Sequence, residues 1–301
     1  MRILLIGASG QVGSALRRTL PVFGDLIVID RTDLDFAQPE NVRQHVMQAQ
    51  PNLIVNAAAY TDVESAESDE AGAFAVNALS VGELALAARD LGATLVHYST
   101  DYVFDGSKPE PYNEDDEPRP LSVYGRSKLE GERRIRNAGC PHLILRTSWV
   151  YAAQGHNFLR TMLRLGRERQ ELRIVDDQFG APTYARFVAE ATVRMLMRAV
   201  ADDQARNRAE EGDIVHLVNE GATSWFGFAR EIFAKAQAAG YKPAPRLIPV
   251  RSSEFLSRVQ RPRNSRLSIA RAGTIWGLTP PTWQHSLSEC LDELCREFEQ
   301  I

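Results

Sequence analysis

Residues 1–20 read MRILLIGASGQVGSALRRTL. The apolar run Ile3–Ile6 leads directly into Gly7-Ala8-Ser9-Gly10-Gln11-Val12-Gly13, and helical apolar periodicity follows over Val12–Leu20. A buried strand, a glycine-rich turn and a helix in this order predict the start of an open parallel sheet with a dinucleotide site at its edge.

Each glycine of this loop has a predicted role. Gly7 would permit the tight turn, Gly10 would let the backbone approach a pyrophosphate, and Gly13 would let the helix pack closely on the strand. The helix N-terminus would offer unpaired N–H groups and a positive dipole end to the phosphates. Glycines that merely turn the chain are the alternative, and the strand before and the helix after the loop argue against it.

The same alternation of short apolar runs and helical patterns continues along the first half of the chain. Continuously apolar strands separated by helices predict an α/β fold with a doubly wound parallel sheet, covered by helices on both faces. The predicted strands are 3–6, 26–30, 53–55, 94–99 and 143–147, and the predicted helices are 12–20, 41–50, 71–90 and 124–137.

The pattern changes after about residue 150, where helices are separated by irregular segments that contain proline. We expect a dinucleotide-binding domain over 1–150 and a smaller, mainly substrate-binding domain over 151–301, with some elements returning to the first domain. The irregular segments include Gly180–Thr183 and Lys242–Pro245, and the polar stretch Ala201–Gly212 is predicted to be a surface loop. The later predicted helices are 157–169, 185–198 and 225–239.

Composition limits the class of protein. A chain of 301 residues with 44% hydrophobic content can bury a substantial core. Lys and Arg number 35 against 39 Asp and Glu, and the net charge of −4 does not favour a nucleic-acid or membrane-surface partner. Cys140, Cys290 and Cys295 have no C-x-x-C spacing and are expected to be reduced thiols. We find no signal peptide and no apolar stretch near membrane-spanning length, so we expect a cytoplasmic protein.

Two acidic positions and one basic position follow the second predicted strand. Asp30 comes 23 residues after Gly7, where an acid binds the adenosine ribose hydroxyls. Arg31 could instead pair with a 2′-phosphate, so NADH and NADPH both stay open. Asp35 and Phe36 could border the adenine, or could form only a turn and a core contact.

Tyr124 and Lys128 lie four residues apart at the start of a predicted helix, and therefore on one face. A tyrosine has a pKa of about 10, and a nearby cation would lower it toward the range useful for acid–base catalysis. Lys128 could also bind the nicotinamide ribose. A solvated helix face is the alternative, but Thr100 ends a strand at the ligand-binding edge of the sheet and could hydrogen-bond a substrate carbonyl.

These residues and several longer segments resemble the extended short-chain dehydrogenase/reductases over nearly the whole chain. The similarity is most detailed to the branch that reduces the 4-keto group of dTDP-4-dehydro-6-deoxy-L-mannose to give dTDP-L-rhamnose. The segments STDYVF and RTSW are specific to it. The matching segments are 7–13, 56–63, 99–106, 123–125, 146–151, 177–183, 261–262 and 264–265.

The resemblance implies an oxidoreductase that uses NADPH or NADH, and it implies a role for individual residues. The implied catalytic residues are Thr100, Tyr124 and Lys128. The residues implied to line the cofactor are Gly10, Gln11, Val12, Asp30, Asp35, Phe36, Ala59, Tyr60 and Thr61, with Tyr124 and Lys128. The residues implied to face the sugar nucleotide are Val63, Thr100, Asp101, Tyr102 and Trp149. The indole of Trp149 could stack on the apolar face of a deoxysugar; without the family context, core packing is the better interpretation.

Three further patterns bear on the reaction. Related dehydratases place Asp-Glu after the threonine, whereas Asp101 is followed here by Tyr102, which favours reduction over elimination. A basic cluster, from which we single out Arg261, is either a solvated loop or a group that pairs with a substrate pyrophosphate. The histidines have no metal-ligand spacing and are interpreted as packing or surface residues. The cluster is Arg258, Arg261, Arg263, Arg266 and Arg271, and the histidines are His45, His97, His142, His156, His216 and His285.

Other functions stay open at this stage. Non-catalytic regulatory subunits of methionine adenosyltransferase resemble the same reductases, although they would not need all three catalytic residues. An epimerase or reductase of another nucleotide sugar is the other alternative. Some members of the family form a metal-bridged dimer through glutamates at two positions, where this chain has Ala15 and Arg186. We therefore expect no metal, and a monomer or a dimer held by another surface.

Overall fold

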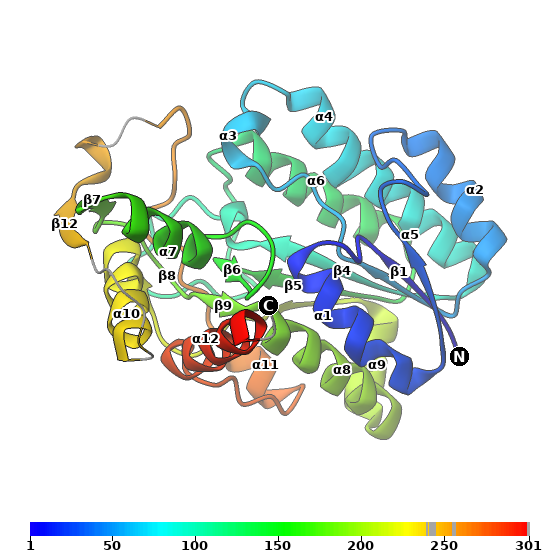
Figure 1. Ribbon diagram of the computed structural model, residues 1–301. Helices are drawn as coiled ribbons and strands as arrows, with labels where there is room; N and C mark the ends of the chain where they lie inside the picture. Colours follow the sequence, from blue (N-terminus) through cyan, green and yellow to red (C-terminus); the bar gives the residue numbers. More distant parts are fainter. Residues whose placement is uncertain (239, 241–244, 255–256, 300–301) are drawn as a thin grey trace.

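The computed structural model describes residues 1–238, 240, 245–254 and 257–299, and it confirms the predicted α/β fold. A six-stranded sheet has the order β10-β5-β4-β3-β1-β2, with every pairing parallel (Figure 1). The strand order reverses between β1 and β3, which is where ligands bind in open α/β sheets. The strands are β1 (Arg2–Ile6), β2 (Asp25–Ile29), β3 (Leu53–Asn56), β4 (Thr94–Thr100), β5 (His142–Thr147) and β10 (Asp213–His216).

Helices cover both faces of this sheet (Figure 1). In β1, Ile3 and Leu5 pack into the core on one face, while Leu4 and Ile6 pack into the core on the other. Burial on both faces is why Ile3–Ile6 contains no polar residue. The first face is covered by α1 (Gln11–Thr19), α8 (Ala185–Ala201) and α9 (Asp203–Glu211), and the second by α2 (Pro39–Ala49), α5 (Ser80–Leu91) and α6 (Val123–Ala138).

The predicted helix over 71–90 is interrupted by a π-helical turn. It consists of α4 (Glu70–Phe74), η2 (Ala75–Leu79) and α5. By length and composition alone, Glu70–Leu91 could span a membrane, so the expectation that no stretch approaches this length is wrong. More than half of its apolar window is buried, and α5 packs against α2 and α6, which is typical of a core helix.

The second half contains short strand pairs and helices around an apolar core of its own, which includes Tyr151, Leu159, Phe228 and Trp283. The strand pairs are β6 (Val150–Tyr151) with β9 (Thr183–Tyr184), β7 (Glu171–Val175) with β12 (Arg246–Val250), and β8 (Phe179–Gly180) with β11 (Thr223–Ser224). The helices around this core are α7 (Phe158–Glu168), α10 (Trp225–Ala238) and α12 (Trp283–Glu299), whereas α11 (Ala270–Thr274) packs into the core of the six-stranded sheet through Ala272. Shorter helical segments are η1 (Leu20–Phe23), α3 (Val63–Ala66), η3 (Asp101–Val103) and η4 (Ser252–Glu254).

Two elements of the sheet half were not predicted from the sequence, the helix α9 and the strand β10. The stretch Ala201–Gly212 is not a loop, because residues 203–211 form α9. The Asp202 side chain accepts from the amide of Ala205 at its start, and Ala205 and Ala209 are buried one turn apart. The strand β10 then adds to the edge of the sheet. Of the predicted irregular segments, 180–183 runs from β8 into β9, while residues 242–244 lie outside the described residues.

Candidate active site

A cleft of about 2080 Å³ runs along the carboxyl ends of the strands, and both halves of the chain line it. It contains the predicted cofactor and substrate residues, and only Gly13 of the predicted set lies outside its wall. The predicted residues that line it are Gly7, Gly10, Gln11, Val12, Asp30, Arg31, Asp35, Phe36, Ala59, Tyr60, Thr61, Val63, Thr100, Asp101, Tyr102, Tyr124, Lys128, Trp149 and Arg261.

The glycine loop has the geometry that its sequence predicts. Gly7 has φ +78°, and a Cβ there would lie 2.6 Å from the Ala58 amide nitrogen. A Cβ on Gly13 would lie 2.0 Å from the Gly7 carbonyl oxygen, so only glycine allows α1 to pack this closely on the turn. No side chain of the described residues caps α1 at Gly10. Its first amides therefore stay available to an acceptor such as a phosphate, and the loop fits a dinucleotide.

The acidic residue after β2 is tied to this loop. Asp30 Oδ1 accepts from the Ser9 amide at 2.9 Å, and the exposed Arg31 lines the cleft beside it. Asp30 and Arg31 both line the cleft, so the geometry is compatible with a ribose hydroxyl of NADH and with the 2′-phosphate of NADPH. Asp35 Oδ1 accepts from a backbone amide two residues on, and Phe36 is 6% exposed. These two residues make the turn and the core contact, and they also form part of the cleft wall.

Asn77, which the sequence analysis missed, holds the segment 59–61. It lies in the π-helical turn η2 and is buried. Its Oδ1 accepts from the Tyr60 amide at 2.9 Å, and its Nδ2 donates to the Tyr60 carbonyl and the Ser127 hydroxyl, each at 3.0 Å. One side chain thus connects the loop that is predicted to line the cofactor to α6. The π turn, which is common at functional sites, is the local feature that could have identified it.

The structure brings Thr100, Tyr124 and Lys128 into one wall of the cleft. Thr100 is the last residue of β4, while the other two lie on consecutive turns of α6. The Ser122 side chain caps α6 by accepting from the Gly125 amide at 3.1 Å. A Cβ on Gly125 would lie 2.2 Å from the Tyr102 carbonyl oxygen, so this glycine allows the start of the helix to approach η3, the turn that follows β4.

The phenol and the amine are not arranged as the sequence predicts. Lys128 Nζ donates to the Tyr98 carbonyl oxygen at 2.6 Å and lies 3.1 Å from His97 Nε2. Burial lowers the pKa of Lys128 to about 8. Burial also raises the pKa of Tyr124, and a hydrogen bond with Thr100 offsets this only in part. The expected lowering of the tyrosine pKa is therefore absent from this structure, because burial dominates and the lysine contacts β4 instead.

Asp101 adjoins this group as a buried carboxyl. The Thr100 hydroxyl donates to Asp101 Oδ1 at 3.0 Å. Oδ2 is buried and has no partner of good hydrogen-bond geometry among the described residues. The nearby Ser265 hydroxyl lowers the pKa of Asp101, but burial is the larger effect and raises it to about 7. The ring of Tyr102, the next residue, meets that of Tyr124 edge-to-face at 5.7 Å. Thus no glutamate follows Asp101 at the floor of the cleft, and phenols lie there instead.

Trp149 packs against another side chain and also lines the cleft. Its ring stacks on that of Trp225 at 3.6 Å and 8°, and both rings line the cleft. Its φ of +46° is rarely adopted by a bulky side chain. Gly180 leaves room for the indole, because a Cβ there would lie 2.5 Å from Trp149 Cε2. One face of Trp149 is therefore packed, and the ring still contributes to the cavity wall.

The arginines of the predicted basic cluster separate in space. Arg261 and Arg263 line the cleft, and Arg261 Nη2 donates to Glu64 Oε1 at 3.0 Å. Arg258 lies in a neighbouring hollow, while Arg266 donates to the Pro109 carbonyl oxygen. The single-cluster interpretation is wrong, because successive side chains of this irregular segment point to different neighbours.

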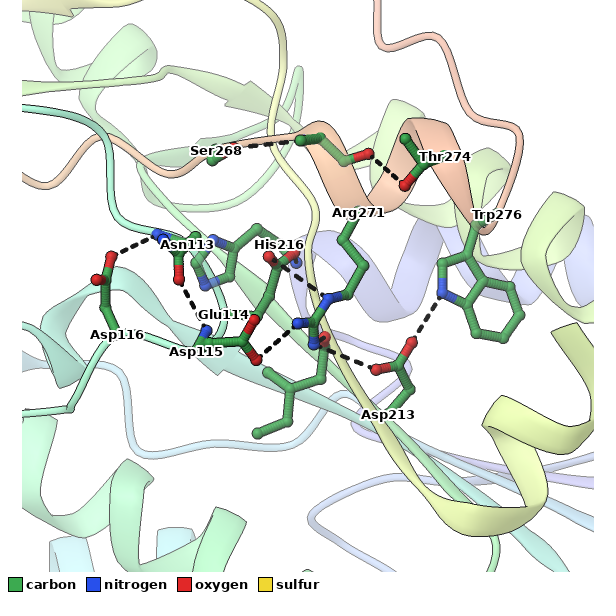
Figure 2. A network of polar contacts seen from close by, with 12 residues as sticks. Asn113, Glu114, Asp115, Asp116, Asp213, His216, Ser268, Arg271, Thr274 and Trp276 are labelled. Carbon is green, nitrogen blue, oxygen red and sulfur yellow. Dashed lines mark hydrogen bonds and ion pairs between the residues drawn. The ribbon is translucent and has the colours of Figure 1, made fainter. Parts of the chain in front are cut away.

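Arg271 of the same cluster belongs to a polar network away from the cleft (Figure 2). Its guanidinium lies 2.7 Å from Asp115, 3.4 Å from Asp213 and 3.7 Å from Glu114. Trp276 Nε1 donates to Asp213 at 3.1 Å. These contacts attach α11 to the edge strand β10. Arg271 therefore has a structural role and does not line the cleft.

A buried ion pair lies behind the part of the cleft wall that contains Thr100, Tyr124 and Lys128. Arg146 on β5 makes a bidentate pair with Glu132 on α6, with Nε–Oε1 at 2.9 Å and Nη2–Oε2 at 2.7 Å. Both side chains are 2% exposed. The Ser99 hydroxyl donates to the same carboxylate at 2.5 Å. The pair therefore joins β4, β5 and the helix that carries Tyr124 and Lys128.

The predicted absence of a metal is consistent with the surroundings of Arg186. Its Nε donates to Glu190 Oε1 at 2.9 Å, and this bond raises the pKa of the guanidinium. Glu289 also contributes to this shift, so a fixed cation already lies among these carboxylates. Ala15 on α1 offers no ligand. No metal-ligating group of three side chains is found within the described residues, and the metal question stays a prediction.

Comparison with known proteins gives consistent results at the levels of family, sequence and fold. A family model described as the RmlD substrate binding domain matches residues 1–296. A dTDP-4-dehydrorhamnose reductase of Burkholderia thailandensis is 44% identical over 98% of this chain and 99% of its own, and one from Escherichia coli is 43% identical over 98% of both. The crystal structure of a Bacillus anthracis dTDP-4-dehydrorhamnose reductase in complex with NADP has a TM-score of 0.86 at 35% identity, covering 97% of this chain and 99% of that chain.

Proposed function

Because this chain belongs to the RmlD substrate binding domain family, we propose that it is a dTDP-4-dehydrorhamnose reductase. In the proposed reaction, the 4-keto group of dTDP-4-dehydro-6-deoxy-L-mannose is reduced to the hydroxyl of dTDP-L-rhamnose, with NADPH or NADH as the reductant. One observation carries the proposal: Thr100, Tyr124 and Lys128 share a wall of the cleft that also contains the glycine loop and Trp149.

The glycine-loop end of the cleft fits the cofactor. The first amides of α1 would bind the pyrophosphate, and Asp30 or Arg31 would bind the adenosine ribose. The segment Ala59–Thr61 and Lys128 would lie along the nicotinamide half. When bound, the reduced nicotinamide supplies the hydride. The NADP complex of the Bacillus anthracis relative supports a phosphorylated dinucleotide as one possible cofactor.

Tyr124 is the proposed proton donor. Reduction of a ketone places negative charge on its oxygen, which must receive a proton, so the acid has to be protonated at the start. The raised pKa of Tyr124 keeps its hydroxyl protonated throughout the neutral range. Thr100 would hydrogen-bond the carbonyl oxygen by turning its hydroxyl from Asp101 toward the substrate. Lys128 would orient the cofactor through its ribose.

The other end of the cleft is the proposed sugar-nucleotide site. The indole of Trp149 would stack on the apolar face of the deoxysugar, with Val63 and Tyr102 beside it. Asp101 would bind a sugar hydroxyl through its unpaired oxygen. Arg261 would pair with the substrate pyrophosphate after exchanging its contact with Glu64.

The same assignment divides the chain. We propose that residues 1–150 bind the cofactor and that residues 151–301 mainly bind the sugar nucleotide, while α8, α9 and β10 return to the first unit. A cytoplasmic location, the lack of nucleic-acid or membrane partners, and a monomer or a dimer without a metal bridge stay predictions from the sequence.

The test is to follow oxidation of NADPH and of NADH by the purified protein with a panel of nucleotide-linked 4-keto-6-deoxysugars. We expect turnover with dTDP-6-deoxy-L-lyxo-4-hexulose, the same compound as dTDP-4-dehydrorhamnose, and dTDP-L-rhamnose as the product. Faster turnover of a sugar on another nucleotide would indicate a different reductase. Tight cofactor binding with no turnover on any sugar would favour the non-catalytic regulatory subunit, and interconversion without net oxidation of the cofactor would favour an epimerase.

A further inference from the structure

His97 lies directly behind Lys128 and has no solvent exposure. Its imidazole is held between two side chains from different elements. On β3, Asn56 is the register partner of His97, and Asn56 Nδ2 lies 3.1 Å from His97 Nδ1. On α6, Lys128 Nζ lies 3.1 Å from His97 Nε2. Both ring nitrogens therefore have a partner, and the tautomer of the ring decides which nitrogen donates and which accepts.

The orientation of the Asn56 amide determines the ring tautomer. Asn56 Oδ1 accepts from the Ala58 backbone amide at 3.1 Å, and a backbone N–H can only donate. The amide cannot be turned over without losing this bond, so its Nδ2 faces His97. His97 Nδ1 must then accept a hydrogen bond, which leaves the single proton of the neutral ring on Nε2.

This tautomer has a consequence for Lys128. An Nε2–H group can donate to Nζ only when Nζ has a lone pair, which an amine has and an ammonium lacks. The amine keeps two N–H groups, and one of them donates to the Tyr98 carbonyl oxygen at 2.6 Å. The second N–H stays available to the cleft, which Lys128 lines.

Other groups around Lys128 do not replace His97 as a partner. Glu132, one turn further along α6, is paired with Arg146 and accepts from Ser99, although its charge favours the ammonium to some extent. Tyr124 is protonated at neutral pH. Burial already lowers the pKa of Lys128 to about 8, and a hydrogen bond accepted by the amine would lower it further.

We propose that His97 is a positioning residue that holds Lys128 as an uncharged amine, through the Nε2–H tautomer that Asn56 imposes. The inference rests on the proposed function in that it takes Lys128 as the cofactor-orienting residue. Lys128 becomes an ammonium only when Nζ leaves His97 or when the Asn56 amide turns over. Proton uptake therefore accompanies movement of Nζ into the cleft, where a cofactor ribose would receive its hydrogen bonds.

The first test is the ¹⁵N spectrum of the histidine side chains in the purified protein between pH 7 and 8, with a His97→Gln variant to assign the signals. We expect the neutral Nε2–H tautomer for His97. His142 is an internal control of the opposite kind, because its Nδ1 faces the Cys140 carbonyl oxygen at 2.8 Å and must donate. An Nδ1–H tautomer or an imidazolium at His97 would overturn the proposal, and the spectrum of the unmodified protein decides this even where a variant fails to fold.

The second test is Asn56→Asp, which replaces Nδ2 by an oxygen and keeps the acceptor for the Ala58 amide. His97 Nδ1 should then donate, leaving Nε2 to accept from an ammonium at Lys128. We expect the tautomer to reverse and the alkaline limb of the kcat/KM profile to move up by about one pH unit, a tenfold change in proton affinity. If the double variant Asn56→Asp/His97→Gln shows an equal shift, the negative charge introduced at position 56 explains the shift without His97. That result would overturn the proposed link between Asn56, His97 and Lys128.

The positioning role of His97 and the proposed reductase activity can fail independently. The His97 tautomer is measured without substrate, so a protein with the expected tautomer and no turnover on any nucleotide sugar contradicts the proposed function only. Turnover as proposed, with His97 in the Nδ1–H form, contradicts only the positioning role.

Discussion

Replacement of Tyr124 by phenylalanine removes one hydroxyl and leaves the ring in place. The ring would keep its edge-to-face contact with Tyr102, and the cap of α6 at Ser122 does not involve the side chain of residue 124. The variant should therefore fold normally and bind the cofactor with little change in affinity, while the proposed proton donor is lost.

The size of the effect follows from what remains in the cleft wall. A positioned general acid contributes a factor of about 10²–10⁴ to a rate, which corresponds to about 3–5 kcal/mol of transition-state stabilisation. Thr100 is the nearest other hydroxyl, but its proton is directed to Asp101 Oδ1. The amine of Lys128 is turned toward β4. Since neither group replaces the phenol, we expect a loss of kcat in the upper part of this range, about 10³-fold or more.

The assay measures kcat by cofactor oxidation at saturating sugar nucleotide, together with the cofactor dissociation constant. Tyr102→Phe is the comparison variant: it removes a second hydroxyl from the same cleft, at the proposed sugar site, and should therefore act on KM for the sugar nucleotide more than on kcat. Lys128→Ala should impair both kcat and cofactor binding, since it is assigned to both. A kcat for Tyr124→Phe within tenfold of the unmodified enzyme would refute the assignment of the proton donor.

Three further predictions concern the substrate, the metal and the ion pair behind the site. Arg261→Ala should raise KM for the sugar nucleotide and leave the cofactor KM nearly unchanged; equal effects on both, or none, would return this arginine to a solvated loop. Activity and oligomeric mass should be the same in EDTA and in Mg²⁺, because Arg186 already supplies a fixed cation; Mg²⁺-dependent dimerisation in light scattering would disprove this. Arg146→Met leaves Glu132 buried without its partner and should lower the free energy of unfolding by about 3–5 kcal/mol in denaturant titrations, against about 1 kcal/mol or less for the exposed control Arg164→Met.

The first five strands are predictable because their apolar side chains pack on both faces of the sheet, and they are buried in β1, β3, β4 and β5 and partly buried in the edge strand β2. The run Ile3–Ile6 alternates between two cores, so every position is apolar and the boundaries are clear. The sixth strand lacks this signal: Asp213 and His216 are polar at its two ends, and both are buried by specific partners or packing rather than by an apolar pattern. Its place at the sheet edge depends on contacts made by the distant α11, which the local sequence does not contain.

The helix α9 shows a weak pattern that was present in the sequence. Its segment is polar almost throughout, and composition therefore predicted a loop. However, Ala205 and Ala209 are four residues apart, and Asp202 precedes them as a capping residue. Two small apolar residues at helical spacing suffice here because α9 covers only an edge of the layer, against α8 and β5.

Residues that lie on one helix can be placed relative to each other from the sequence, because their separation along the chain fixes their separation on the helix. Tyr124 and Lys128 are one turn apart on α6, so helix geometry alone places them together. The arginines 258–271 lie on an irregular segment, where closeness in sequence does not predict closeness in space. His97 could not be assigned from the sequence, because its contact with Lys128 depends on the β3–β4 register and on the approach of α6.

The ionisable groups at the floor of the cleft are shifted in a common direction. Burial raises the pKa of Tyr124, raises that of Asp101 to about 7 and lowers that of Lys128 to about 8. Each shift favours the uncharged form. A ketone is neutral before reduction and its product alcohol is neutral afterwards, so a protonated Tyr124 matches both end states and supplies a proton where charge develops transiently. A tyrosinate would instead be the form suited to removing a proton from an alcohol. The burial that raises the pKa of Tyr124 therefore suits the reducing direction of the proposed reaction.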